Sequence, residues 1–158
     1  MKQVIPLLLA LLMVGCATQK KTAKTAQRMT VRTTAYTHTE AGGVNNAIGT
    51  RLRFGGDVYS AASDWSWMPL GTRFRMVENG RTYVVEDYGS ALVGRQTIDL
   101  YVPSMSAVNK WGVRKIDIEI LEWGSKAMSL KLLKPRATHT YIQTMVAELQ
   151  KAVPPVST

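Results

Sequence analysis

Three aspartates, Asp64, Asp87 and Asp99, lie in segments of the sequence that could support acid–base chemistry. Asp99 lies inside an apolar run, between Ile98 and Leu100. A carboxylate that is buried without a partner is costly, so such a group favours its neutral form. Carboxyls that cluster raise one another's pKa, which suits a general acid. The sequence therefore predicts a carboxyl-based site, and Asp99 is its strongest candidate.

The aspartates also have a structural interpretation. Asp64 and Asp87 could cap turns through their side-chain oxygens. We expect this role for Asp64, which comes shortly before a strand that begins near Thr72. For Asp87 both roles stay open, and for Asp99 the position within a strand favours a functional role.

Other catalytic and ligand-binding patterns find little support in the sequence. Cys16 is the one cysteine, so neither an intrachain disulfide nor a cysteine metal cluster is available. His38 and His139 lie far apart along the chain, which argues against a zinc site and against a Ser-His-Asp triad. The glycine pairs do not have a phosphate-binding spacing. We expect neither a metal nor a cofactor.

The net charge of +9 is distributed unevenly along the chain. Lysine and arginine are in excess in residues 17–29 and 125–158, whereas residues 30–124 hold ten basic and ten acidic side chains. A nucleic-acid-binding domain concentrates positive charge on its folded face, so the sequence disfavours a nucleic-acid partner. Basic flanks suit anionic lipid head groups or the acidic cell wall.

The N-terminal residues predict an export signal. Lys2 precedes an almost unbroken apolar run that ends at Val14; the run is too short to span a bilayer, which takes about 20 residues, and it suits the h-region of a signal peptide. Residues 12–16 resemble the bacterial lipobox, which predicts lipidation of Cys16. An ordinary signal peptide with an incidental cysteine is the alternative. Because Ala17 rather than aspartate follows the cysteine, we expect an outer-membrane anchor that faces the periplasm.

After a flexible basic tether over residues 17–29, the middle of the chain predicts short strands. Their residues are β-branched or aromatic, or alternate between apolar and polar as half-buried strands do. Asn79-Gly80 predicts a hairpin with a two-residue turn between two of them. Short strands between glycine-containing turns predict an all-β fold over residues 30–124, either a small barrel or a sandwich. The predicted strands are residues 30–37, 72–77, 82–87, 97–102 and 115–121.

Residues 125–158 predict a basic tail with an amphipathic helix. Apolar side chains recur there at helical spacing, and Pro154 ends the run. We expect the helix to pack on the β domain; a helix that rests on the membrane surface is the alternative. The residues of the apolar stripe are Tyr141, Ile142, Met145, Val146, Leu149 and Ala152.

In their order and spacing these segments resemble the 3D domain. This domain is named for three aspartates and occurs in the membrane-bound lytic murein transglycosylase A family and in small stationary-phase survival proteins. The resemblance covers about residues 31–123, places Asp64, Asp87 and Asp99 on the three aspartates, and implies a six-stranded double-psi β-barrel. The matching segments are Thr34-Ala35-Tyr36, Asp64 with Pro69-Leu70-Gly71-Thr72, Asp87-Tyr88-Gly89 with Gly94, Thr97-Ile98-Asp99-Leu100-Tyr101 and Trp111-Gly112-Val113-Arg114.

The resemblance also implies an activity, the cleavage of peptidoglycan glycan strands without water. The aspartic acid that corresponds to Asp99 protonates the oxygen between N-acetylmuramic acid and N-acetylglucosamine. The same group, now a base, activates the 6-hydroxyl of the muramic acid, which closes a 1,6-anhydro ring. Asp87 would be its partner, and the reaction needs no metal or cofactor. Further residues expected to bind substrate or to support the site are Tyr36, Asp64, Trp65, Tyr88 and Gly89.

Two features depart from the family. The family usually has Asp-Thr-Gly-Gly where this chain has Asp87-Tyr88-Gly89-Ser90. The larger transglycosylases also carry a second domain that walls the groove, which we do not expect here. A non-catalytic lipoprotein that binds peptidoglycan through the same barrel is the alternative function. Trp65, Trp67 and Trp111 suit both hypotheses, because aromatic faces stack on sugar rings, and they would be equally ordinary in the core.

Overall fold

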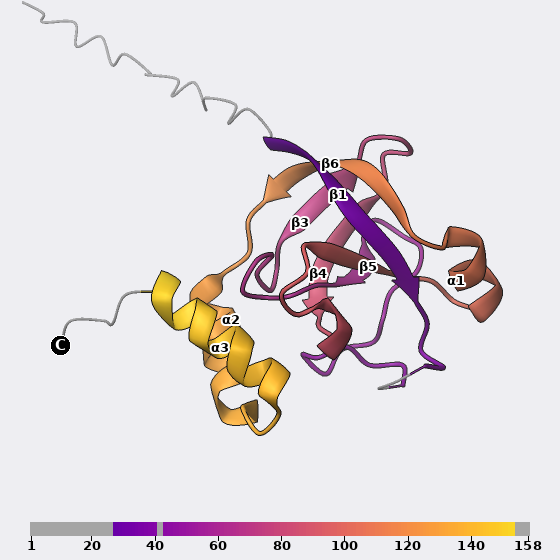
Figure 1. The fold of residues 1–158 in the computed structure, drawn as a ribbon. Helices are drawn as coiled ribbons and strands as arrows, with labels where there is room; N and C mark the ends of the chain where they lie inside the picture. The colour runs from indigo at the N-terminus through magenta and orange to yellow at the C-terminus, as the bar shows by residue number, and fades with distance from the viewer. Residues whose placement is uncertain (1–26, 41–42, 154–158) are drawn as a thin grey trace, which may run out of the picture.

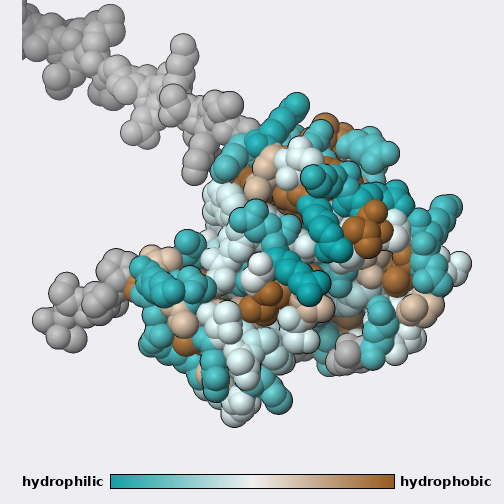
Figure 2. Space-filling model, in the orientation of Figure 1, coloured by the Kyte–Doolittle hydropathy of each residue, from teal (hydrophilic) through white to brown (hydrophobic). Residues whose placement is uncertain are grey.

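The structure is a computed structural model that describes residues 27–40 and 43–153. The predicted signal peptide, the lipobox with Cys16 and most of the predicted tether lie outside the described residues. Within these two ranges, no helix is long and apolar enough to cross a membrane. The face of the molecule in Figure 2 is largely hydrophilic, with small and separate hydrophobic patches.

Six strands close into a barrel in the order β1-β5-β2-β4-β3-β6 (Figure 1). Two neighbouring pairs, β1 with β5 and β2 with β4, are parallel, and the other pairs are antiparallel. The strands are β1 (Gln27–Tyr36), β2 (Tyr59–Ala62), β3 (Arg73–Met76), β4 (Thr82–Asp87), β5 (Thr97–Tyr101) and β6 (Arg114–Glu122). The predicted six-stranded all-β barrel is confirmed, and the sandwich alternative is wrong.

Alternating side chains fill the inside of the barrel. On β3, Phe74 and Met76 are buried while the arginines beside them are exposed. On β5, Ile98 and Leu100 are buried and Asp99 between them is only partly so. Burial of one large apolar side chain stabilises the fold by about 1.5–3 kcal/mol. The same alternation that builds the core therefore turns Asp99 to the outside of the barrel wall.

Two boundaries differ from the sequence prediction. β1 begins at Gln27, which pairs with Ile120 of β6, so the last residues of the predicted tether belong to the barrel. β2 was not predicted, because it has four residues and no alternation: Ser60, Ala61 and Ala62 are all buried. Small residues enclosed on both sides leave no period-2 pattern for a sequence argument to detect.

The hairpin between β3 and β4 is present, but its turn is longer than predicted. Met76 donates a backbone hydrogen bond to Arg81, which leaves the four residues 77–80 in the connection. A two-residue type I′ turn needs two residues with positive φ. Gly80 has φ 71°, whereas no non-glycine residue of the described ranges, Asn79 included, has a positive φ.

Helices lie on two sides of the barrel in Figure 1, with α1 (Met105–Trp111) on one side and α2 (Lys126–Leu133) next to α3 (Thr140–Ala152) on the other. The predicted helix is α3, and its residues Ile142, Met145 and Leu149 are buried, at most 3% exposed. This apolar stripe belongs to the same core cluster as the barrel, so it is not free to rest on a membrane. α1 and α2 were not predicted.

Close backbone contacts attach the helical hairpin, which α2 and α3 form, to the barrel. Ser125 donates its N–H to the Leu70 carbonyl oxygen (3.0 Å), and the Leu70 N–H donates to the Ser129 hydroxyl (2.9 Å). Gly124 lies so close to this turn that a Cβ atom there would overlap the Leu70 and Pro69 carbonyl oxygens. The chain can therefore turn from β6 into α2 only with a glycine at this position.

Candidate active site

Asp87 and Asp99 lie on either side of Ala62 in the barrel wall. Ala62 on β2 pairs with Asp87 on β4 and with Asp99 on β5. Neighbouring strands are about 4.8 Å apart, so the two aspartate backbones are separated by about 10 Å. Because the residue between them carries only a methyl group, the space between the two carboxyl groups stays open.

A β-bulge decides which acid of β4 faces this space. The core residues of β4 alternate, and strict alternation from the buried Val85 would turn Asp87 into the core as well. The register with β2 shifts at this point, so that Glu86 becomes the extra residue and Asp87 pairs with Ala62. A bulge of this kind re-aims a side chain. Asp87 thereby joins Asp99 on the outer face of the barrel wall.

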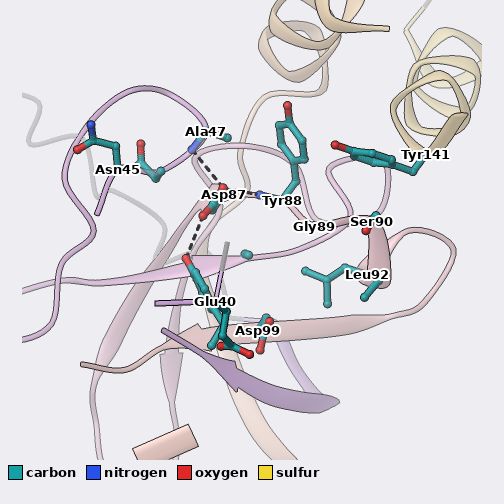
Figure 3. A pocket seen from close by; sticks show the side chains of 14 residues that line it. Glu40, Asn45, Ala47, Asp87, Tyr88, Gly89, Ser90, Leu92, Asp99 and Tyr141 are labelled. Atoms are coloured by element: carbon teal, nitrogen blue, oxygen red, sulfur yellow. Dashed lines mark hydrogen bonds between the residues drawn. The ribbon is translucent and has the colours of Figure 1, made fainter. Parts of the chain in front are cut away.

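An open cavity of about 550 Å³ lies over the two aspartates (Figure 3). Its lining comes from the barrel wall, from the loops that follow β1 and β4, and from α3. The side chains that combine charge or aromatic character there are Tyr36, Glu40, Asp87, Tyr88, Asp99 and Tyr141. The cavity therefore brings two of the three predicted aspartates together with several aromatic side chains.

Asp87 accepts three hydrogen bonds. The backbone N–H groups of Ala47 and Tyr88 donate to Oδ1, at 3.1 and 3.0 Å, and the Tyr36 hydroxyl donates to Oδ2 at 3.2 Å. Burial raises the pKa of Asp87 above its ordinary value, and these donors oppose that rise only in part. The Tyr36 pKa lies far above its ordinary value, because of burial first and the Asp87 charge second. Tyr36 therefore keeps its proton and stays a donor to Asp87.

Asp99 accepts a hydrogen bond from the Thr34 hydroxyl at 2.7 Å. Burial raises the pKa of Asp99 to about 6; the Thr34 bond opposes the rise, and the negative charges of Glu40 and Asp87 add to it. A carboxyl with a pKa close to the working pH can both give and take a proton, as a general acid and base must. Of the two aspartates in the cavity, Asp99 has the environment that suits this chemistry.

Asp64 lies apart from the cavity lining and has the turn-capping geometry expected of it. It is 3% exposed. Its Oδ1 accepts from the N–H and the hydroxyl of Ser66 (2.8 and 2.6 Å), and its Oδ2 accepts from the N–H of Gly94 (2.8 Å). Asp64 therefore links the turn after β2 to the loop between β4 and β5, the loop that carries one side of the cavity.

Trp65 cannot stack on a sugar. It is fully buried, its ring lies edge-on to Tyr88 with centroids 4.9 Å apart, and its Nε1–H donates to the Asp87 carbonyl oxygen at 2.9 Å. Of the two roles considered for Trp65, sugar stacking and packing in the core, only packing in the core is compatible with this burial. Trp67 and Trp111 are half-buried, and neither lines this cavity.

Gly89 lines the cavity at the start of the short 3₁₀ helix η1 (Ser90–Leu92). Its φ of −144° is open to any residue, and an added Cβ would make only ordinary contacts with Leu92. Gly89 thus lies where the sequence predicts a site residue, but the backbone there does not require a glycine.

Among the cavity residues that were not predicted are Glu40, Ala47, Ala62 and Tyr141. Ala47 acts through its backbone N–H, and Ala62 through its small size, so neither has a side-chain chemistry to notice. Tyr141 was assigned to the apolar stripe of its helix, but its side chain is only partly buried. Among residues 27–40 and 43–153, no group of three or more His, Cys, Asp or Glu side chains could hold a metal ion.

Comparison with known proteins finds similarity over most of the barrel, including the three aspartates. Residues 59–122 match the model of the 3D domain. Two proteins of Bacillus subtilis (strain 168), the cell wall-binding protein YocH and the putative cell wall shaping protein YabE, are each 34% identical to this chain over 98 residues, or 61% of it. The chain covers 33% of the first relative and 24% of the second, so it spans a third of their length or less. The region that matches the 3D domain runs from the start of β2 to the end of β6.

Proposed function

We propose that this protein is a peptidoglycan lytic transglycosylase in which Asp99 is the general acid and base. The observation that carries the proposal is the placement of Asp99, with a pKa of about 6, in an open cavity beside a second carboxyl group. The names of the two relatives, cell wall-binding and cell wall shaping, point to the same substrate and do not specify a reaction.

The reaction balances without water, metal or cofactor. Protonated Asp99 donates its proton to the oxygen that links C1 of N-acetylmuramic acid to N-acetylglucosamine, and the C1–O bond breaks with its electron pair on the leaving oxygen. C1 then carries oxocarbenium character. The Asp99 carboxylate takes the proton of the 6-hydroxyl of the same muramic acid as that oxygen attacks C1. The 1,6-anhydro ring closes, and Asp99 is protonated again.

Asp87 and Tyr36 support this cycle electrostatically. The negative charge of Asp87, two strands away from Asp99, opposes the ionisation of Asp99 and favours positive charge at C1. Tyr36 holds the Asp87 carboxylate through its hydroxyl (3.2 Å) and cannot exchange that proton near neutral pH. In this cycle Asp99 thus carries the mobile proton, while Asp87 carries a negative charge.

A non-catalytic role in binding the cell wall is the second candidate, and the name of the relative YocH favours it. In this case the cavity would hold the glycan strand, and Asp99 would contribute only hydrogen bonds. Both candidates place the same ligand in the same cavity. They differ in whether the glycosidic bond breaks.

One experiment separates the two candidates. Purified protein is incubated with murein sacculi, and the soluble products are analysed by mass spectrometry for anhydro-muropeptides. Their release by the wild-type protein supports the enzyme. Sacculus binding without any anhydro product would exclude the transglycosylase and leave the wall-binding role.

We also propose that Cys16 anchors the protein to a membrane through a lipid, with the barrel in the periplasm. The proposal comes from the lipobox-like residues 12–16, which lie outside the described structure. Wild-type protein should partition with membranes, and Cys16→Ser protein should be released in folded form. A Cys16→Ser protein that is processed normally and stays on the membrane would contradict lipidation.

A further inference from the structure

The helical hairpin that follows the matched 3D domain contributes to the cavity from outside that domain. The match ends at residue 122, whereas α2 and α3 begin at Lys126 and Thr140. The Arg136 guanidinium, in the connection between the two helices, donates to the Ala47 carbonyl oxygen at 2.7 Å. Ala47 in turn donates its N–H to Asp87. The hairpin is therefore fixed to the loop that holds one of the two carboxyl groups.

The same hairpin places an aromatic side chain in the cavity. Tyr141, in the first turn of α3, lies beside Tyr88 with ring centroids 6.4 Å apart and a tilt of 50° (Figure 3). His139 lies nearly parallel to Tyr141, at 15° and 5.6 Å, an offset arrangement. Tyr88 is backed by the fully buried Trp65. The tyrosine pair is thus supported from behind, and both rings line the cavity.

We infer that Tyr88 and Tyr141 form a subsite for an uncharged hexosamine ring of the glycan strand, next to Asp87 and Asp99. The inference rests on the proposed action on peptidoglycan and adds the part of the substrate that the hairpin binds. A pyranose ring has an apolar face that packs on an aromatic ring and hydroxyls at its edge. The two phenol groups can donate to or accept from those hydroxyls.

The charge of the cavity favours the sugar over the peptide stem. Among the described residues that line it are the acids Glu40, Asp87 and Asp99, and none of its described lining residues is a lysine or an arginine. The carboxylates of a peptide stem would meet like charges there. N-acetylglucosamine, the hexosamine without a lactyl carboxylate, carries no charge and avoids that repulsion. The aromatic pair therefore fits a sugar ring in line with the bond that Asp99 would protonate.

The test measures glycan binding without cleavage. Full-length protein carrying Asp99→Asn is titrated with peptide-free glycan strands, prepared from sacculi with an amidase, and Kd is determined by calorimetry. In this background Tyr141→Ala should weaken binding about tenfold, which corresponds to 1.4 kcal/mol. Tyr141→Phe and Tyr141→Trp keep an aromatic face and should stay within about threefold of the parent.

Trp123→Ala is the matched control, because Trp123 is a 40% exposed aromatic side chain outside this cavity. It should leave the Kd unchanged. Unchanged binding by Tyr141→Ala, with a thermal unfolding midpoint like the parent's, would overturn the subsite. So would equal losses in Tyr141→Ala and Trp123→Ala, or a parent that does not bind peptide-free strands. A wild-type protein that forms no anhydro product would refute the transglycosylase and leave this binding result standing.

Discussion

The turn around Asp64 and the cavity around Asp99 place the same kind of side chain in opposite environments. Asp64 is enclosed, and its two oxygens accept three hydrogen bonds, two of them from backbone N–H groups. Asp99 has one donor, the Thr34 hydroxyl, and faces an open cavity next to other acids. Donors stabilise the charged form of a carboxyl group, whereas burial and like charges favour the neutral form. The hydrogen-bond donors and charged neighbours of each aspartate, rather than its sequence motif, therefore decide whether it has a structural or a chemical role.

The largest expected effect is the loss of activity in Asp99→Asn. The amide has nearly the same shape and can still accept the Thr34 hydrogen bond, so the barrel should fold. It can neither deliver nor take the proton, so formation of anhydro-muropeptides should fall by about 10²-fold or more. Product release from sacculi, quantified by mass spectrometry, measures the loss. Full activity in Asp99→Asn would remove this residue from the mechanism and leave Asp87 and Glu40 as the remaining acids of the cavity.

Asp87→Asn should reduce activity less and change its pH dependence. The negative charge of Asp87 is one of the causes that raise the pKa of Asp99. Its removal lowers that pKa, so the protonated acid is lost at a lower pH and the alkaline limb of the activity profile moves to lower pH. Glu78→Gln, in the hairpin turn, is the control; an unchanged profile in Asp87→Asn would contradict electrostatic coupling.

The core of this site follows from the sequence, but its surroundings do not. Alternation along residues 97–102 places Asp99 outside the core, and Asp87 was found because a strand ends there in a glycine-containing turn. The bulge at Glu86 depends on how β2 and β4 pair, which no local pattern encodes. The contribution of Tyr141 depends on how α3 packs across the cavity. Contacts between segments far apart in the chain determine both features, so only the structure reveals them.

Asp64→Asn should lower stability and spare the reaction. In the wild-type protein, donors point at both carboxylate oxygens of Asp64. The amide of asparagine places an NH₂ group opposite one of these donors, so at least one of the hydrogen bonds from Ser66 or Gly94 is lost in a buried place. An unsatisfied buried group costs about 1–3 kcal/mol. Urea unfolding measures the difference against Asp57→Asn, an exposed aspartate that should have no effect. Activity well below the unfolding transition should match the wild type; a loss there as large as that of Asp99→Asn would place Asp64 in the chemistry.

The smallest expected effect is opposite in sign, because Asp99→Asn should stabilise the folded protein near neutral pH. The pKa of Asp99 is raised from 3.8 to about 6 in the folded chain. At about pH 3 or below, the folded chain and the unfolded chain both hold this proton for most of the time, so the group costs little. Between about pH 4 and 6 the unfolded chain releases the proton while the folded chain keeps it, and the free energy of unfolding falls.

Above that range the folded protein carries a poorly solvated carboxylate, which asparagine avoids. Because Asp99 partly faces solvent, the gain in Asp99→Asn should be on the order of 1 kcal/mol. Urea unfolding of wild type and Asp99→Asn at about pH 7.5 and about pH 3 measures it: we expect a more stable variant at the higher pH and equal stabilities at the lower. The opposite order at the higher pH would mean that the ionised carboxylate is well solvated or well paired. The environment of Asp99 would then resemble that of Asp64, and the distinction between the two regions would not hold.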